Sequence, residues 1–210
     1  YYFGRKFGFK FASTDNKNLF EDKKCNTIVI ATKHDSHSTY IKKALKAKMN
    51  VFVEKPLCLT KRQLIEIKET YLEIKNEGRY NPILMVGFNR RFAPLTKLLK
   101  KHLNRMSGKK SFIYTINAGT IPLDHWIHDL NIGGGRLIGE CCHFVDLLRY
   151  LVGYKIQNID IFPLIETSNK FDTFSLQLSF EDGSSASIHY FSNGSKAYPK
   201  ERLEVFCNEQ

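Results

Sequence analysis

Residues 27–56 read TIVIATKHDSHSTYIKKALKAKMNVFVEKP, and this stretch decides the fold. Residues 27–31 form a continuous apolar run rich in β-branched side chains, which is typical of a strand buried on both faces of a sheet. Residues 37–47 carry apolar side chains at helical spacing, and residues 51–53 form a second short apolar strand. We therefore expect a strand–helix–strand unit with two parallel strands and a right-handed crossover.

The pattern continues with a second such unit. Thr60 is placed to cap a helix that Gly78 would end, and residues 83–87 form a third apolar strand. Ligands of parallel sheets bind beyond the carboxyl ends of the strands. We therefore expect the functional residues of this half within three loop segments: 32–37, 54–56 and 88–91.

The second half of the chain has a different pattern. Two amphipathic helices are expected, over residues 94–105 and 137–152, and the strand-like segments are 111–116, 156–164, 173–180, 185–191 and 202–206. Alternating apolar and polar residues in these strands predict a mainly antiparallel, open-faced sheet with helices on one side. The predicted fold class is α/β followed by α+β. Residues 1–91 would be a partial Rossmann-type domain and residues 92–210 a partial substrate and oligomerisation domain.

Composition and charge restrict the class of protein. The 210 residues are 42% hydrophobic and 25% charged, which excludes a disordered tail, a collagen-like fibre and a coiled-coil rod. No run of about 18 apolar residues is present, so we expect no membrane span and a cytoplasmic protein. The net charge of +11 raises the alternative of nucleic-acid binding. Lys outnumbers Arg 23 to 9, however, which favours a Lys-rich solvated surface over bidentate phosphate or base contacts.

The five cysteines indicate free thiols in a reducing compartment. No Cys-x-x-Cys spacing occurs, and the cysteines lie in or beside apolar segments. The run Cys141-Cys142-His143 suggests zinc at first sight, but adjacent helical residues point about 100° apart and converge poorly on one ion. We therefore predict no metal site.

The tripeptide Glu54-Lys55-Pro56 follows the second strand and has the chemistry of a site. A carboxylate at this position can accept hydrogen bonds from ribose hydroxyls, and the neighbouring ammonium can orient a substrate hydroxyl. The proline restricts the backbone so that both side chains are directed by the turn. The alternative is an ordinary surface ion pair in a loop.

A second motif runs from Gly133 to Asp146. A glycine loop opens a helix on which Glu140, His143 and Asp146 recur at intervals of three, and residues three apart share a helix face. A carboxylate and an imidazole could then meet one ligand, with the second carboxylate orienting the imidazole. Histidine is suited to accept a proton from an alcohol near neutral pH. The alternatives are a polar stripe, a buried histidine with one partner, or a flexible connector.

Taken together, these motifs resemble the Gfo/Idh/MocA oxidoreductases, the relatives of glucose–fructose oxidoreductase and inositol dehydrogenase. The resemblance covers the chain from about residue 5 to its end and rests on five ordered segments: 31–32, 37, 54–56, 87–92 and 133–146. The segment Asp124-His125-Trp126-Ile127-His128-Asp129 is similar to the bi-domain branch, in which a family member is fused behind an alcohol-dehydrogenase-like domain.

The resemblance implies an NAD- or NADP-dependent dehydrogenase that moves a hydride between the nicotinamide and a hydroxyl or keto group of a sugar, cyclitol or nucleotide sugar. Its catalytic residues would be Lys55 and the base His143, assisted by Glu140. Cofactor-binding residues are implied at Thr32, His34, His37, Glu54, Lys55 and Asn89, and substrate-binding residues at Lys55, Arg90, Trp126 and Asp146. A homo-oligomer through the second sheet is also implied.

Two departures from the family pattern bear on these expectations. The family has an aspartate four residues before the catalytic histidine, where this chain has Gly139, so we expect Glu140 to substitute for it. The family also begins with a strand, a GxGxxG turn and a helix, which the 210 residues do not contain. We therefore expect the chain to be a fragment that is inactive alone. The alternatives are a non-catalytic sugar-binding module and a nucleic-acid-binding protein.

Overall fold

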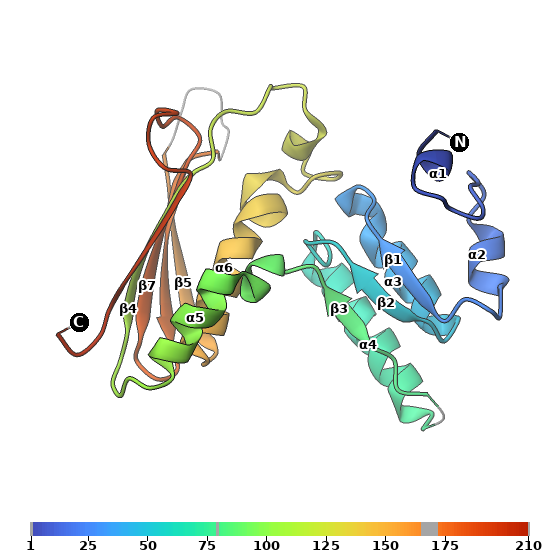
Figure 1. Cartoon of the computed structure of the whole chain (residues 1–210), viewed down its shortest axis with the longest axis horizontal. Coiled ribbons are helices and arrows are strands. Elements are labelled where there is room, and N and C mark those ends of the chain that lie inside the picture. The colour runs from blue at the N-terminus through green and yellow to red at the C-terminus, as the bar shows by residue number, and fades with distance from the viewer. Residues whose placement is uncertain (1, 79, 165–171, 210) are drawn as a thin grey trace.

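The computed structural model describes residues 2–78, 80–164 and 172–209. Its first sheet consists of three parallel strands in the order β1 (Thr27–Ile30), β2 (Asn50–Val53) and β3 (Leu84–Val86). Helices α3 (His37–Lys46) and α4 (Lys61–Asn76) connect them. The predicted pair of parallel strand–helix–strand units is confirmed (Figure 1). Two short helices, α1 (Tyr2–Lys6) and α2 (Lys17–Glu21), precede this sheet.

Local sequence explains where α4 begins and ends. The Thr60 hydroxyl accepts a hydrogen bond from the backbone N–H of Gln63, and the Gln63 side chain accepts one from the backbone of Thr60. This reciprocal capping box satisfies two N–H groups that would otherwise lack partners. Beyond the helix, Gly78 adopts φ +70°, a conformation that favours glycine and ends the helix as predicted.

The expectation that the first strand is buried on both faces is wrong. Helices α3 and α4 pack against each other and therefore lie on the same face of the sheet. On that face Ile28 and Ile30 are buried, whereas Val29 between them is 67% exposed. The β-branched run was a correct sign of a strand, but it carried no information about how many faces are covered.

The second sheet has five strands in the order β5 (Ile156–Pro163), β6 (Phe174–Phe180), β7 (Ser185–Phe191), β4 (Ser111–Asn117) and β8 (Glu201–Phe206). Only the β4–β7 pair is parallel among these strands, so the sheet is mainly antiparallel as predicted. Helices α5 (Pro94–Leu103) and α6 (Cys142–Val152) lie on one side of it (Figure 1). Gly153 ends α6 at φ +91°.

The expected helix over residues 137–152 begins differently from its prediction. Its first turn is a π-helix, η4 (Leu137–Cys141), and regular α-helix starts at Cys142. The hydrogen bonds of a π-helix span one residue more than those of an α-helix, and π-helical turns are often found at functional sites. The side chains before and after Cys141 therefore do not follow one uniform helical spacing.

The two sheets have separate hydrophobic cores. One gathers α3, α4 and the first sheet, and the other lies between α5, α6 and the second sheet. The opposite face of the second sheet carries polar cross-strand pairs, including Ser175 with His189 and Gln177 with Ser187. A domain boundary near residue 92 stays a prediction.

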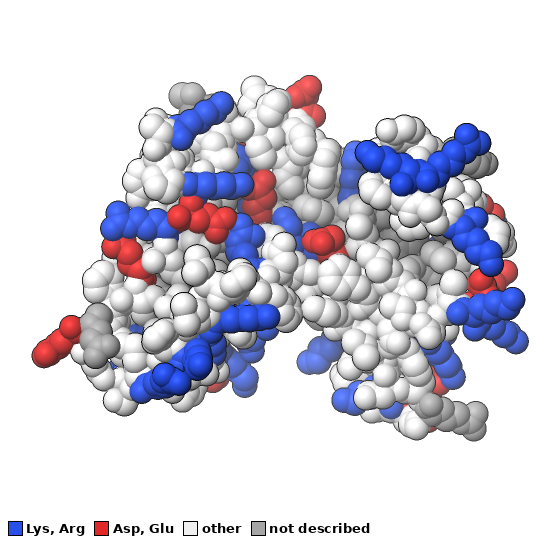
Figure 2. Space-filling view, viewed as in Figure 1, with Lys and Arg blue, Asp and Glu red and all other residues white. Residues whose placement is uncertain are grey.

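Several surface features complete the description. In the view of Figure 2, Lys and Arg side chains are spread over many elements of the chain. Among the described residues, no helix combines the length and the apolar character that a membrane crossing requires. All five cysteines are free thiols.

Candidate functional site

His37 joins the loops that follow β1 and β2. Its side chain is 0% exposed, and its Nδ1 and Nε2 lie 2.8 Å and 3.0 Å from the carbonyl oxygens of Pro56 and Thr32. The imidazole thus fixes the backbone beside Lys55. This differs from the prediction that His37 binds the cofactor, because burial leaves its ring in contact with backbone. Thr32 itself is exposed, and its hydroxyl lies 2.6 Å from that of Ser36.

His34 connects the first sheet to the glycine loop of the second half. Its Nδ1 donates to the carbonyl oxygen of Gly133 over 2.8 Å, and the ring is 7% exposed. Burial lowers the pKa of His34. The indole of Trp126 packs edge-on against it, with ring centroids 4.8 Å apart. Both residues were predicted as ligand contacts, but in the structure they mainly dock the loop onto the first sheet.

Lys55 reaches from the first half to the π-helix. Its ammonium donates to the carbonyl oxygen of Gly139 over 2.7 Å. The Lys55–Pro56 peptide bond is cis. Glu54 is exposed beside it, and a Cβ built on Gly87 would lie 3.0 Å from the Glu54 carboxylate. Glycine at position 87 therefore lets the carboxylate lie close to the end of β3, at the edge where parallel sheets bind ligands.

His143 lies close enough to Lys55 for the ammonium charge to act on its imidazole. Its Nδ1 is buried and has no hydrogen-bond partner among the described residues. Burial, followed by the charges of Lys55 and Arg90, lowers the pKa of His143 to about 4, while the charge of Glu201 opposes this shift. The imidazole is therefore neutral at pH 7. The ring of Phe88 packs edge-on to it at 6.1 Å between centroids.

Glu140 has two hydrogen-bond partners that the sequence did not indicate. Its carboxylate accepts hydrogen bonds from the Arg136 guanidinium, at 3.2 Å, and from the Tyr190 hydroxyl. Arg136 is 1% exposed and also donates to Tyr190 and to the carbonyl oxygen of Gly119. Burial, together with the Glu140 hydrogen bond, raises the pKa of Tyr190. Glu140 thus anchors η4 on β7, and its expected role in place of the missing aspartate stays a prediction.

The close packing around Gly139 explains why this position has no side chain. A Cβ at this position would lie 2.6 Å from Ile127 Cδ1, 2.8 Å from the Gly133 oxygen and 3.2 Å from His34 Cε1. The loop that crosses the site therefore fills the volume that an aspartate would need. The backbone carbonyl of Gly139, rather than a carboxylate, is the acceptor for Lys55.

Asp146 and Arg90 also have partners that the sequence did not indicate. Asp146 accepts two hydrogen bonds from Arg91, one of them 2.7 Å from Nε, so it does not orient His143. Arg90 of the 3-10 helix η2 (Asn89–Phe92) binds the Glu201 carboxylate in the same two-pronged manner. Each guanidinium thus carries a carboxylate partner. Asn89 is exposed, and its role stays a prediction.

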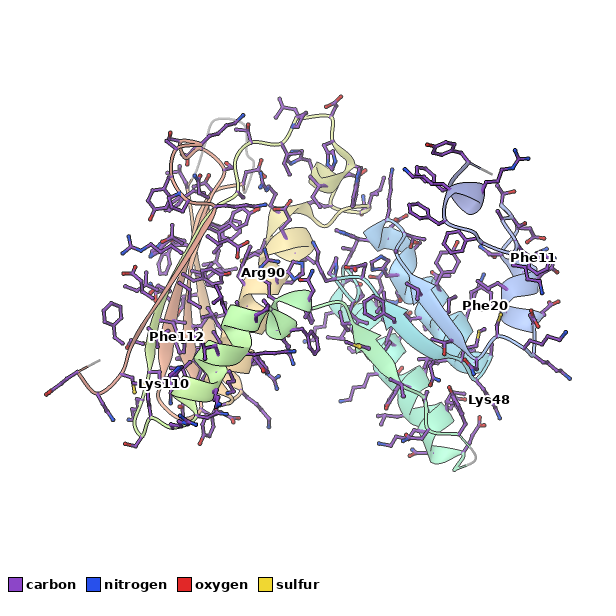
Figure 3. The ribbon with its side chains drawn as sticks, in the orientation of Figure 1. Phe11, Phe20, Lys48, Arg90, Lys110 and Phe112 are labelled. Atoms are coloured by element: carbon purple, nitrogen blue, oxygen red, sulfur yellow. The ribbon has the colours of Figure 1, made fainter. Side chains whose placement is uncertain are left out.

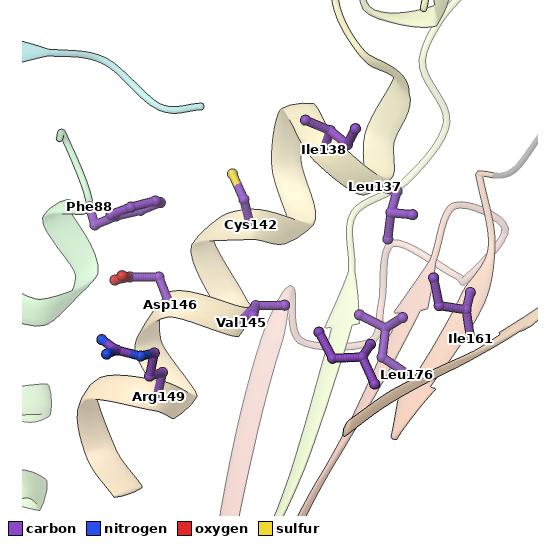
Figure 4. A pocket seen from close by; sticks show the side chains of 10 residues that line it. Phe88, Leu137, Ile138, Cys142, Val145, Asp146, Arg149, Ile161 and Leu176 are labelled. Carbon is purple, nitrogen blue, oxygen red and sulfur yellow. The ribbon is translucent and has the colours of Figure 1, made fainter. Parts of the chain in front are cut away.

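A pocket of ≈460 Å³ lies beside this cluster, between α6 and the second sheet (Figure 4). Its lining includes Phe88, Cys142 and Asp146, but neither Lys55 nor His143. Burial raises the pKa of Cys142 to about 11, so this thiol is protonated at pH 7. Apart from Cys142, Asp146 and Arg149, the residues that line the pocket are apolar. No group of three or more metal-binding side chains gathers within the described residues.

Sequence reasoning missed Glu201 and Arg136. Glu201 is 58 residues beyond His143 and belongs to no motif, so nothing in the local sequence marked it. Arg136 offered a weak signal, because an isolated Arg within the glycine-rich start of an apolar helix needs a partner when it is buried.

Comparison with known proteins identifies the family of the chain. Residues 2–79 match the family model described as oxidoreductase family, NAD-binding Rossmann fold, and residues 111–210 match the GFO/IDH/MocA C-terminal domain. The fold and the matched models define a class of NAD-binding oxidoreductases. Within this class, the chain belongs to the Gfo/Idh/MocA family.

Several of the curated relatives are named as dehydrogenases. The chain is 28% identical over 210 residues to myo-inositol 2-dehydrogenase of Thermotoga maritima, covering 96% of this chain and 60% of that protein. It is 28% identical over 193 residues to scyllo-inositol 2-dehydrogenase (NAD(+)) of Bacillus subtilis, covering 88% of this chain and 54% of that protein. The chain therefore spans little more than half the length of these relatives.

Solved structures share the fold. A probable dehydrogenase from Thermotoga maritima superposes with a TM-score of 0.81 at 26% identity, over 99% of this chain and 62% of that one. A levoglucosan dehydrogenase in complex with NADH and levoglucosan gives a TM-score of 0.83 over 97% of this chain and 57% of that one. At 21% identity, this second likeness shows the fold alone.

Proposed function

We propose that the longer protein containing this chain is an NAD-dependent dehydrogenase that oxidises a secondary alcohol of a sugar or cyclitol. The observation that carries the proposal is the meeting of Lys55 and His143, which come from the two halves of the chain, beyond the carboxyl ends of the parallel strands. This is where such sheets bind ligands. The inositol and levoglucosan dehydrogenases among the relatives support this class of substrate.

The two side chains supply complementary proton chemistry. His143 is neutral at pH 7, because its pKa lies near 4, and a neutral imidazole can accept the proton of a substrate hydroxyl. The Lys55 ammonium has two further N–H groups besides the one bound to Gly139, and these can stabilise the developing alkoxide. NAD, when bound, supplies the hydride acceptor.

Part of a cofactor site fits the residues of the chain. Thr32 and Glu54 are exposed at the carboxyl ends of β1 and β2, and a hydroxyl and a carboxylate there suit the hydroxyls of a ribose. The glycine-rich phosphate turn is not among the 210 residues. We therefore expect the 210-residue chain to bind NAD or NADP weakly and to be inactive alone.

The test uses the full-length protein with NAD or NADP and each of myo-inositol, scyllo-inositol and levoglucosan. Absorbance of the reduced nicotinamide should rise, and Lys55→Met and His143→Gln should each lower kcat/KM by about 100-fold or more. Lys61→Ala, at the exposed start of α4, is the matched control and should change little. Full activity in the Lys55 and His143 variants would refute these roles.

A second candidate is a sugar-binding module without turnover. It is favoured because, among the described residues, no carboxylate is hydrogen-bonded to His143, and Glu140 and Asp146 are both engaged by arginines. Calorimetry would then show binding of a sugar or cyclitol by the full-length protein with no nicotinamide reduction.

A homo-oligomer through the polar face of the second sheet stays part of the proposal, to be measured by light scattering.

A further inference from the structure

Glu201 is the meeting point of three elements. It is the first residue of β8, opposite Ile116 of the neighbouring strand β4. Its two carboxylate oxygens accept hydrogen bonds from Arg90 Nη2 at 2.5 Å and Nε at 3.3 Å, and from the Tyr114 hydroxyl at 2.6 Å. These bonds outweigh burial, and the pKa of Glu201 is lowered, so the carboxylate is ionised at pH 7.

The Arg90 guanidinium is fixed by this carboxylate in a defined place. Its Cζ lies 4.7 Å above the centroid of the Phe144 ring, and the Tyr114 ring packs edge-on against the same ring at 5.2 Å. Phe144 is buried and directly follows His143 in α6. Figure 3 shows Arg90 in the region between the two sheets. Glu201 thus places a cation against the turn of helix that carries the proposed base.

The charges around His143 come from several elements. Lys55 lies in the loop after β2, Arg90 in η2 and Glu201 in β8, while Tyr114 of β4 is bonded to Glu201. On the helical segment of His143 itself, Glu140 is paired with Arg136 and Asp146 with Arg91. Two cations therefore act on the imidazole, and the Glu201 carboxylate offsets one of them.

We propose that Glu201 is a positioning residue for His143: it holds Arg90 on the Phe144 ring and neutralises that guanidinium beside the imidazole. The effect of Glu201 on turnover rests on the proposed function, but its effect on the charge around His143 does not. Without the carboxylate, Arg90 would add an uncompensated positive charge next to a group that must accept a proton.

The decisive experiment is an NMR titration of the His143 imidazole in the 210-residue chain, with the resonance assigned by its loss in His143→Gln. Glu201→Gln should lower the titration midpoint by roughly half a pH unit or more, because a neutral amide no longer offsets Arg90. Glu204→Gln is the matched control on the same strand, since Glu204 pairs with the exposed Arg202. It should leave the midpoint unchanged.

Two further variants test the same charge pair from the side of Arg90. Arg90→Gln should raise the midpoint, and Arg90→Gln combined with Glu201→Gln should bring it back to the wild-type value or above. If Glu201→Gln does not fold, as judged by circular dichroism, the sign of the Arg90→Gln change decides. A midpoint in folded Glu201→Gln equal to that of Glu204→Gln, or an unchanged or lower midpoint in Arg90→Gln, would overturn the proposal.

Kinetics of the full-length protein then separate this inference from the proposed function. In an active enzyme, Glu201→Gln should move the acid limb of the kcat/KM profile to lower pH, whereas a purely structural loss would lower activity at every pH. If the wild-type protein shows no turnover, the dehydrogenase proposal fails, while the NMR midpoints still decide the role of Glu201.

Discussion

The two sides of the candidate site hold their cations in opposite ways. On the side of η2, η4 and α6, each of Arg90, Arg91 and Arg136 meets a carboxylate. On the side of the first sheet, Lys55 meets a backbone carbonyl and has no carboxylate partner among the described residues. A carbonyl orients an ammonium without cancelling its charge. The three arginines therefore stabilise the structure through their carboxylate partners. The charge of Lys55 is not neutralised in this way and is available to a ligand.

The largest effect that tests this comparison is expected at Arg136. Arg136→Met would leave the Tyr190 hydroxyl, the Glu140 carboxylate and the Gly119 carbonyl without the buried guanidinium that binds them. Breaking a buried pair costs roughly 3–5 kcal/mol, and we expect about 3 kcal/mol because Glu140 is partly exposed. Urea denaturation of the chain measures it.

Arg149→Met is the matched control for Arg136. Arg149 lies exposed in the last turn of α6, and its loss should change the free energy of unfolding by less than about 0.5 kcal/mol. Equal costs for the two substitutions would contradict the structural role assigned to Arg136.

The next effect concerns the backbone acceptor of Lys55. Gly139→Ala forces a Cβ against Ile127 Cδ1 and the Gly133 oxygen, and overpacking of this kind costs about 2 kcal/mol. Combining it with Ile127→Val removes the Cδ1 atom and should recover part of the loss. Unfolding free energies of the four proteins in this double-mutant cycle measure the coupling. Strict additivity would show that the contact between Gly139 and Ile127 is not formed.

Regular patterning made most of the fold predictable. The alternation of apolar runs located β1 to β3, and the alternation in residues 173–191 located β6 and β7. The π-helical turn was not predicted, because the apolar spacing of residues 137–152 fits a regular helix; in the structure Gly139 of this turn packs closely against Ile127 and Gly133. The helical spacing then suggested that Glu140 and Asp146 act together with His143, whereas in the structure their carboxylates bind Arg136 and Arg91.

Ion pairs between residues that are distant in sequence also limited the prediction of the site. Lys55 and His143 were found from motifs, because each follows a strand or glycine loop that marks it. The engagement of Arg90 by Glu201 joins residues 111 positions apart, and that of Asp146 by Arg91 joins residues 55 apart. The spacing of residues in the sequence carries no information about such contacts. It therefore could not show that Arg90 and Arg91 are paired with carboxylates whereas Lys55 is not.

A smaller effect is expected from pH. The folded state holds His143 and His34 with pKa values below the ordinary histidine value of 6.5, so both stay neutral while the unfolded chain gains protons. Their contribution to stability is therefore complete above pH 6.5 and is lost as the pH falls from 6.5 toward 4. Unfolding free energies measured across this window should fall more steeply for wild type than for His143→Gln.

His125→Gln serves as the control for this titration. His125 is exposed and lies outside the buried cluster, so His125→Gln shows what the loss of an exposed imidazole does to the free energy of unfolding. A His143→Gln protein with the wild-type slope would show that the imidazole of His143 is not shielded in the folded state, which would weaken its assignment as the neutral base.

The smallest effect is expected on the uncovered face of the first sheet. Val29 is 67% exposed, so Val29→Thr should change the free energy of unfolding of the chain by no more than about 0.5 kcal/mol. The adjacent Ile30 is 2% exposed, and Ile30→Val should cost about 1 kcal/mol because it removes one buried methyl group. Equal costs at both positions would mean that this face is covered in solution.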